Sequence, residues 1–300
     1  MTSARAARRS RAPRRAPLRR RGLAAVVLAA SVLGACGGGD DGTTPPVTSV
    51  GVTELTVATT AVAEPIRIMP LGDSITEGGD PTQPTTSPQS YRGYLYTMLT
   101  DAGFTVDFVG SNDRPAIAGD DPDNEGHGGF TIGPDESELC DGCGPANLDS
   151  GLEGWLQAGN PDIVLLMIGV NDLLPGETRP TVPEEAGEKL TALVGRIRTL
   201  APEAVVVVAS YPPISFLVDP ALDNSAAFTA LNDAAAELGD GSDPNVLYAP
   251  MFETFEDSWT ADDVLTEAGD NLHPSASGAK RIAGVWFDVL QPVLADWPTN

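Results

Sequence analysis

The sequence has 300 residues, with 18 Lys and Arg against 42 Asp and Glu. Nine of the basic residues precede Cys36 and all of the acids follow it, so nine basic residues and 42 acids give the rest of the chain a net charge of −33. So acidic a surface repels phosphate backbones and anionic headgroups, which excludes nucleic-acid binding and suits a neutral substrate. Acids also serve simply to solvate an exported protein.

The first 35 residues are expected to form an export signal. Residues 1–21 contain nine arginines and no acid, and residues 22–35 form an apolar run that ends at Leu-Gly-Ala-Cys36. This run is too short to span a bilayer, whereas the charged, apolar, small-residue order is typical of a secretory signal. Its end resembles the bacterial lipobox, which makes Cys36 the expected lipidated N-terminus. Cleavage without lipidation stays open, as does twin-arginine export through Arg20 and Arg21.

The predicted organisation is therefore a signal over 1–35, a flexible linker over 36–64 and one domain over 65–300. The linker is rich in Gly, Asp, Thr, Pro and Val and has no lasting period. We expect the protein to be exported and either lipid-anchored at the cell envelope or secreted. In both cases it would contact a membrane only through a lipid at Cys36.

Short apolar runs alternate with helical patterns along the domain, which predicts an α/β fold with a parallel sheet covered by helices on both faces. Helical spacing is clearest in the last stripe, which contains Ala279, Ile282, Trp286 and Leu290. The predicted strands are 66–69, 105–109, 163–168, 204–209 and 246–248.

The first of these strands stops at Gly72-Asp73-Ser74. An apolar run closed by a glycine turn places Ser74 at the carboxyl edge of the sheet, where open α/β sheets bind ligands. Asp73 and Ser74 are equally good residues for capping the next helix. A nucleophilic Ser74 therefore needs a base elsewhere in the chain.

The chain has two histidines that could act as this base, His127 and His273. Asp270 precedes His273 by three residues, a spacing short enough for a carboxylate to reach the ring and fix its tautomer. A surface Asp beside a helix-capping His is the alternative for an isolated pair. With Ser74 upstream, the three residues match what a serine hydrolase requires.

Two further segments offer donors for the oxyanion of an acyl-transfer intermediate. Asn171 follows the strand 163–168, so it should lie at the same edge as Ser74. Residues 124–130 are rich enough in glycine to present backbone N–H groups. Taken separately, Asn171 is also a good turn residue and the glycines a good flexible loop.

Together these residues resemble the SGNH or GDSL hydrolases over roughly residues 66–290. Gly72-Asp73-Ser74 matches the first block of that family, Gly169-x-Asn171-Asp172 the third and Asp270-x-x-His273 the last. The resemblance implies a flavodoxin-like three-layer α/β/α sandwich with a five-stranded parallel sheet. It makes Ser74 the nucleophile, His273 the base and Asp270 its orienting carboxylate. The implied oxyanion hole comprises the Ser74 N–H, the Asn171 side chain and the N–H of Gly129, with Gly128 as the alternative.

Segments 90–95, 106–111 and 125–132 also look like carbohydrate esterase family 3, whose known members remove acetyl groups from xylan. The implied function is an exported serine esterase that hydrolyses O-acyl, in particular O-acetyl, esters of carbohydrates, without a cofactor. Its expected partner is an acylated carbohydrate or another small ester. A lipid or aryl esterase of the same fold and a non-catalytic carbohydrate-binding module are the alternatives. Gly128 stands where serine is expected, and the segment with Cys140 and Cys143 is an insertion.

Three smaller features complete the sequence-based expectations. Cys140 and Cys143 are expected to form a local disulfide after export, with a redox pair or half a zinc site as alternatives. Arg92 either lines the pocket or pairs with an acid. The acids of the loop 120–125 either bind calcium or are solvated; they lack a full EF-hand pattern and consist of Asp120, Asp121, Asp123 and Glu125.

Overall fold

The computed structural model describes residues 64–80, 82–83, 87–116, 120–139, 142, 144–174, 181–214, 224–266 and 270–298. The predicted signal, the lipidation of Cys36 and the pairing of Cys140 with Cys143 lie outside these residues. The described residues all belong to one unit of the chain, Thr59–Asn300. In these ranges no helix has both the length and the apolar character needed to cross a membrane.

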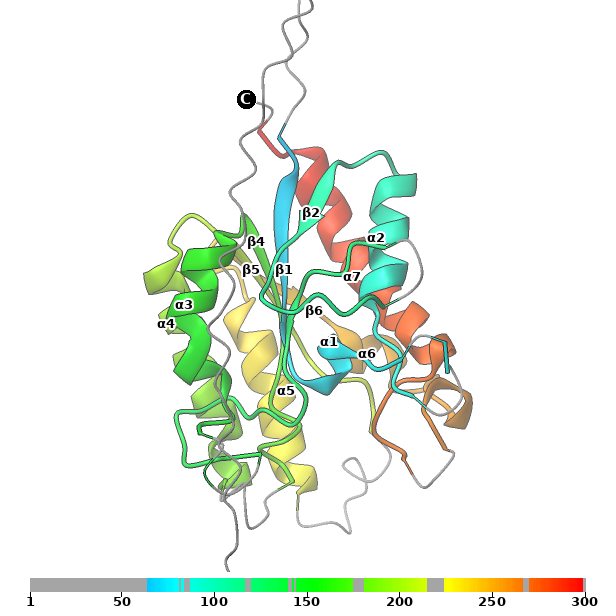
Figure 1. Ribbon diagram of the computed structural model, residues 1–300. Coiled ribbons are helices and arrows are strands. Elements are labelled where there is room, and N and C mark those ends of the chain that lie inside the picture. Colours follow the sequence, from blue (N-terminus) through cyan, green and yellow to red (C-terminus); the bar gives the residue numbers. More distant parts are fainter. Residues whose placement is uncertain are drawn as a thin grey trace, which may run out of the picture. The chain divides into compact units, whose positions relative to one another are not determined.

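A parallel sheet lies at the centre of this unit (Figure 1). Its strands are β1 (Ile66–Gly72), β2 (Val106–Phe108), β3 (Glu125–Gly126), β4 (Ile163–Met167), β5 (Val205–Ala209) and β6 (Val246–Ala249). The main path runs β2-β1-β4-β5-β6, which is the flavodoxin-like strand order. The five predicted strands are therefore confirmed, with ends that differ by a few residues.

The two-residue strand β3 is the element that the sequence did not reveal. It pairs with the last two residues of β1, where Leu71 lies opposite Glu125 and Gly72 opposite Gly126. The strand β2 pairs with the first half of β1, between Ile66 and Ile68. Because β2 ends early, the edge of β1 is left for β3, which brings the glycine-rich segment against the end of β1.

Helices cover both faces of the sheet and complete the three-layer sandwich (Figure 1). They are α1 (Ser74–Glu77), α2 (Arg92–Asp101), α3 (Leu148–Gly159), α4 (Ala186–Leu200), α5 (Ser225–Leu238), α6 (Met251–Phe255) and α7 (Ala276–Ala295), with 3-10 turns at Pro183–Glu185 and Ala261–Asp263. One face carries α3, α4 and α5, and the other carries α2, α6 and α7.

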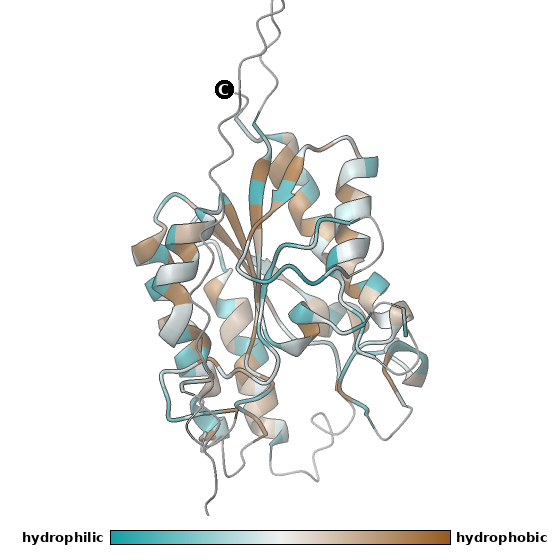
Figure 2. Ribbon diagram, viewed as in Figure 1, coloured by the Kyte–Doolittle hydropathy of each residue, from teal (hydrophilic) through white to brown (hydrophobic). Residues whose placement is uncertain are grey.

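Burial follows the hydropathy of each element (Figure 2). All five residues of β4 are buried, as expected for a central strand with helices on both sides. The apolar stripe of α7 faces the sheet, and its Trp286 packs on Tyr91 with ring centroids 5.7 Å apart. Ser275 begins α7 by accepting a hydrogen bond from the Gly278 N–H. The register of α7 therefore fixes the loop that precedes it, which contains His273.

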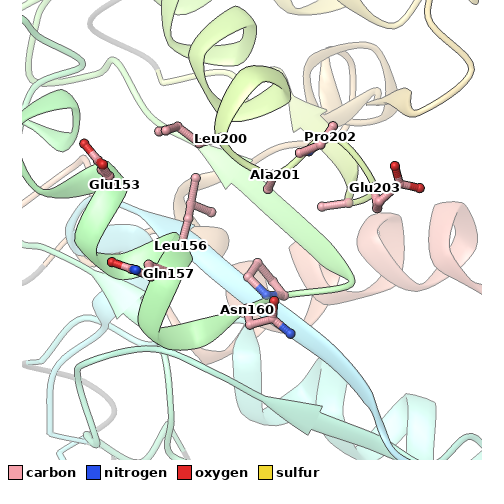
Figure 3. Close-up of a pocket in the computed structure, with 10 residues that line it drawn as sticks. Glu153, Leu156, Gln157, Asn160, Leu200, Ala201, Pro202 and Glu203 are labelled. Atoms are coloured by element: carbon pink, nitrogen blue, oxygen red, sulfur yellow. The ribbon is translucent and has the colours of Figure 1, made fainter.

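All five main strands end at the same edge of the sheet because they are parallel. A cavity of about 450 Å³ lies at the other edge, beside the residues that lead into β4 and β5 (Figure 3). It is lined by the end of α3, with Leu156 and Gln157, and by the segment after α4, with Ala201 and Pro202. This cavity is thus remote from Ser74, and we assign it no part in the chemistry.

Candidate active site

Ser74 lies where the sequence predicts it, two residues beyond the end of β1. Asp73 is the N-cap of α1, and its Oδ1 accepts a hydrogen bond of 2.9 Å from the Ile75 N–H. A Cβ at Gly72 would lie 2.3 Å from the Met167 carbonyl oxygen, so the turn requires glycine there. The capping interpretation is therefore right for Asp73. Ser74 is instead the first helical residue, and its hydroxyl points to a histidine.

Ser74, His273 and Asp270 form a continuous chain of hydrogen bonds. The Ser74 Oγ lies 2.7 Å from His273 Nε2, and His273 Nδ1 lies 2.8 Å from Asp270 Oδ2. The second carboxylate oxygen of Asp270 accepts the N–H groups of Leu272 and His273 at 3.0 and 3.1 Å. An ionised Asp270 accepts a hydrogen bond from the Nδ1–H of His273, which leaves the lone pair on Nε2 facing the serine.

The environment of Asp270 keeps it ionised. Partial burial acts to raise its pKa, but the His273 and Leu272 N–H groups and the His273 ring together hold the pKa below its usual value. The loop itself is held by backbone bonds, since Leu265 donates to the His273 carbonyl at 2.9 Å and Ser275 to the Asp263 carbonyl at 3.0 Å. The distance between the base and Ser74 is therefore set by backbone hydrogen bonds as well as by side chains.

The glycine-rich segment lies against the turn that holds Ser74. The His127 N–H donates to the Gly72 carbonyl at 2.9 Å, which extends the pairing of β3 with β1. The next amide, that of Gly128, donates to Glu77 Oε2 at 2.7 Å. A Cβ at Gly128 would lie 3.8 Å from the Ser74 Cβ, so this segment passes directly beside the serine. Because the Gly128 N–H is already bound to a carboxylate, Gly129 is the better candidate for an oxyanion donor.

Gly129 has a backbone conformation that other residues avoid. Its φ is +81°, and a Cβ there would lie 2.8 Å from a methyl group of Leu139. Leu139 is 55% exposed, one of the few large apolar side chains on the described surface. The candidate oxyanion donor, Gly129, thus has the apolar side chain of Leu139 beside its Cα.

Asn171 follows β4 and is buried beside the same segment. Its Nδ2 donates to the Phe130 carbonyl at 2.9 Å. The turn that holds it begins at Gly169, whose φ is +124°, and closes with a 3.0 Å bond from the Asp172 N–H to the Gly169 carbonyl. The structure therefore places Asn171 in a turn and also joins its amide to the glycine segment.

The second histidine has a structural role. The His127 ring is stacked between Phe130 and Trp155, with centroids 4.8 and 4.4 Å away, and its Nε2 lies 2.7 Å from Glu125 Oε1. Glu125 also accepts the N–H and hydroxyl groups of Ser111. His273 is thus the histidine at the serine, as the D-x-x-H spacing predicts.

The direct partners of Arg92 are backbone carbonyls, while Asp120, Glu77 and Asp121 act on its charge through space. Arg92 is fully buried, and its guanidinium donates to four backbone carbonyls, those of Thr76, Glu77, Arg114 and Pro122, at 2.8 to 3.1 Å. Burial lowers its pKa to about 10. Arg92 therefore joins the end of α1 to the loop after β2, a role that depends on tertiary contacts and left no signal in the sequence.

The acidic loop is also occupied by internal contacts. Asp121 Oδ2 accepts the Phe108 N–H at 2.9 Å, and Asp120 Oδ2 accepts the Ala116 N–H at 2.8 Å. Within the described ranges, no group of three or more His, Cys, Asp or Glu side chains is placed to hold a metal ion.

Comparison with known proteins gives a consistent result. A model of the GDSL-like lipase/acylhydrolase family matches residues 71–281. A family 3 carbohydrate esterase from Clostridium thermocellum is 30% identical, with a TM-score of 0.57 over 77% of this chain and 98% of that chain. A second family 3 carbohydrate esterase, from Talaromyces cellulolyticus, is 26% identical, with a TM-score of 0.56 over 78% of this chain and 100% of that chain.

A multidomain esterase of Ruminococcus flavefaciens is 28% identical over 264 residues, which cover 78% of this chain but 29% of that protein. The chain therefore spans less than a third of the length of this relative.

Proposed function

Because this chain belongs to the GDSL-like lipase/acylhydrolase family, we propose that it is a serine esterase that removes O-acyl groups, in particular O-acetyl groups, from carbohydrates such as xylan. The observation that carries this proposal is the chain of hydrogen bonds from Asp270 through His273 to the Ser74 hydroxyl. It provides a nucleophile, a base and an orienting carboxylate in hydrogen-bonding contact.

The proposed reaction is a double displacement. Ser74 Oγ attacks the ester carbonyl while His273 Nε2 accepts its proton, and the sugar hydroxyl then leaves with that proton. Water, deprotonated by the same imidazole, hydrolyses the acyl enzyme and releases the carboxylic acid. Asp270 stays ionised throughout and stabilises the imidazolium that forms in each step.

We assign the oxyanion hole to three donors, the N–H groups of Ser74 and Gly129 and the Asn171 amide. Preorganised donors of this kind stabilise the tetrahedral intermediate because they need no rearrangement when charge develops. The contact of Gly128 with Glu77 supports Gly129 over its neighbour. The bond from Asn171 to the Phe130 carbonyl supports a fixed position for the amide.

The choice of carbohydrate over lipid has two supports. The relatives named above include two carbohydrate esterases of family 3, at 30% and 26% identity. The strong negative charge of the chain disfavours anionic lipid surfaces and does not disfavour a neutral glycan. A lipid or aryl ester remains the competing substrate class.

We further propose that the domain over 65–300 is exported and tethered through residues 36–64, with Cys36 as its lipid anchor or as the site of plain cleavage.

The test compares four substrates on one preparation: acetylated xylan, acetylated chitooligosaccharide, a lysophospholipid and an aryl acetate. We expect the protein to release acetate from both glycans. In Ser74→Ala, the rate of hydrolysis should fall on the order of 10⁶-fold. Ser225 offers a matched control because it is also the first residue of a helix, α5, and Ser225→Ala should keep full activity. Turnover of the lysophospholipid with no action on either glycan would refute the substrate class. Residual activity of more than a few per cent in Ser74→Ala would refute the mechanism.

A further inference from the structure

A buried carboxylate next to the nucleophile has no part in the proposed mechanism. Asp73 has no exposed surface and directly precedes Ser74. Its Oδ1 is the cap of α1, and its Oδ2 accepts a hydrogen bond of 2.5 Å from the Tyr211 hydroxyl. A cap needs one oxygen, and exposed Asp, Asn or Ser residues provide it equally well. The burial and the second bond therefore require another explanation.

Tyr211 joins Asp73, in the turn before Ser74, to the part of the fold that follows β5. It lies two residues after the end of β5, is 1% exposed, and its N–H donates to Asn232 Oδ1 of α5 at 2.9 Å. One residue thus joins the turn after β1, through Asp73, to helix α5, through Asn232.

Polar and charged groups from several other elements act on the carboxyl group of Asp73. Burial raises its pKa to about 6, against the opposing effects of the Tyr211 hydroxyl, the Ile75 N–H and the positive charge of His273. The charge of Asp73 also acts on the phenol of Tyr91, at the start of α2, and contributes to its raised pKa. Asp172 acts on Tyr211 from the turn after β4. Asp73 directly precedes Ser74, whose Oγ lies 2.7 Å from His273 Nε2, so an ionised Asp73 and an imidazolium at His273 would attract each other across the serine.

We propose that Tyr211 is a positioning residue that keeps Asp73 ionised, and that ionised Asp73 acts as a second carboxylate stabilising the His273 imidazolium during ester hydrolysis. The inference rests on the serine mechanism proposed above and extends it. Asp270 would act through a direct hydrogen bond to the ring, and Asp73 through space from the side of the nucleophile.

Opposite pH shifts are expected from two conservative variants. Tyr211→Phe removes a bond that lowers the pKa of Asp73, so Asp73 should protonate at higher pH and the acid limb of kcat/KM should move upward by about one pH unit. Asp73→Asn keeps a capping oxygen but removes the charge that favours the imidazolium. Its acid limb should move to lower pH, with a plateau lower by roughly tenfold.

The assay is hydrolysis of an aryl acetate by pH-stat, with a melting temperature for every variant. Tyr248→Phe is the matched control, since Tyr248 lies on the neighbouring strand β6 and its hydroxyl bonds Ser210 and Glu253. A merely structural role of Tyr211 would lower the melting temperature without moving the acid limb. An acid limb of Tyr211→Phe that coincides with the wild type, or moves no further than that of Tyr248→Phe, would overturn the inference.

If Tyr211→Phe does not fold, the pH profile of Asp73→Asn is the test. An acid limb of kcat/KM at lower pH than in the wild type supports the inference, and an acid limb at the same pH overturns it. Ser74→Ala separates this failure from that of the mechanism. An active Ser74→Ala would remove the serine mechanism itself. An inactive Ser74→Ala with unmoved limbs in the other variants would remove the role of Asp73 and Tyr211 alone.

Discussion

Methionine has an unbranched side chain like the stem of arginine. Replacing Arg92 with methionine therefore tests how much its hydrogen bonds to α1 and the neighbouring loop stabilise the fold. The substitution removes four hydrogen bonds to backbone carbonyls, of which the bond to Thr76 is buried and the other three are partly buried. Two of these carbonyls keep another donor, because Ser90 Oγ also bonds the Thr76 oxygen and Asn124 Nδ2 the Pro122 oxygen. Among the described residues, no second side-chain donor bonds the carbonyls of Glu77 and Arg114.

The expected cost follows from those two carbonyls. A fully buried acceptor that loses its partner costs about 1–3 kcal/mol, so these two partly buried carbonyls together cost at most about 2–6 kcal/mol. Removing a buried charge offsets part of this, which leads us to expect a loss of about 3 kcal/mol. Against a typical unfolding free energy of about 5–15 kcal/mol, such a loss is large but leaves a folded protein to assay.

Urea unfolding at fixed pH measures this cost, with kcat determined on the same samples. Arg196→Met is the control, since Arg196 is 38% exposed and pairs with Asp149 at the surface, where a loss within about 1 kcal/mol is expected. Arg92→Lys, with fewer donors, should lie between the wild type and Arg92→Met. An Arg92→Met variant no less stable than Arg196→Met would show that the carbonyls find other partners, and would refute the reasoning.

Three further outcomes are expected. Asn171→Ala should lower kcat by about 10²–10³ with little change in KM; a lower melting temperature at unchanged kcat would limit Asn171 to the turn. Gly129→Ala, strained at φ +81° and crowded by Leu139, should reduce kcat more than Gly128→Ala if Gly129 supplies the N–H, and the reverse order would move the role to Gly128. Burial raises the pKa of Asp172 to about 7, so the folded state keeps a proton that the unfolded chain loses near pH 4. The unfolding free energy should therefore fall from about pH 4 to 7, and Asp172→Asn should flatten that dependence; an equal slope in both proteins would contradict it.

The elements that the sequence predicted are those with a local signature. Strand β4 is a continuous apolar run and α7 has an apolar stripe, so periodicity identified both. Strand β3 has two residues, one charged and one glycine, and exists because the end of β1 offers it a free edge. No local pattern encodes such a strand.

The same distinction separates the parts of the site. Ser74 and the Asp270-His273 pair were predictable because scarce residue types stand at meaningful spacings at the ends of elements. Tyr211 was missed because its contact with Asp73 joins residues 138 positions apart, and nothing near Tyr211 distinguishes it from a core aromatic. Arg92 was noticed, but its buried position could not be deduced from composition.

The two halves of the site are anchored with unequal strength. Ser74 lies two residues beyond the central strand β1, which is hydrogen-bonded on both sides. The loop with His273 is attached through a few backbone bonds, including one from the Gln89 N–H to the Pro274 carbonyl at 3.1 Å. Segments with few buried contacts open locally at a lower free-energy cost than the sheet. On heating, we expect enzymatic activity to disappear several degrees before the sheet melts and to return on cooling, so that the working temperature of this protein is limited by a peripheral loop and not by its core.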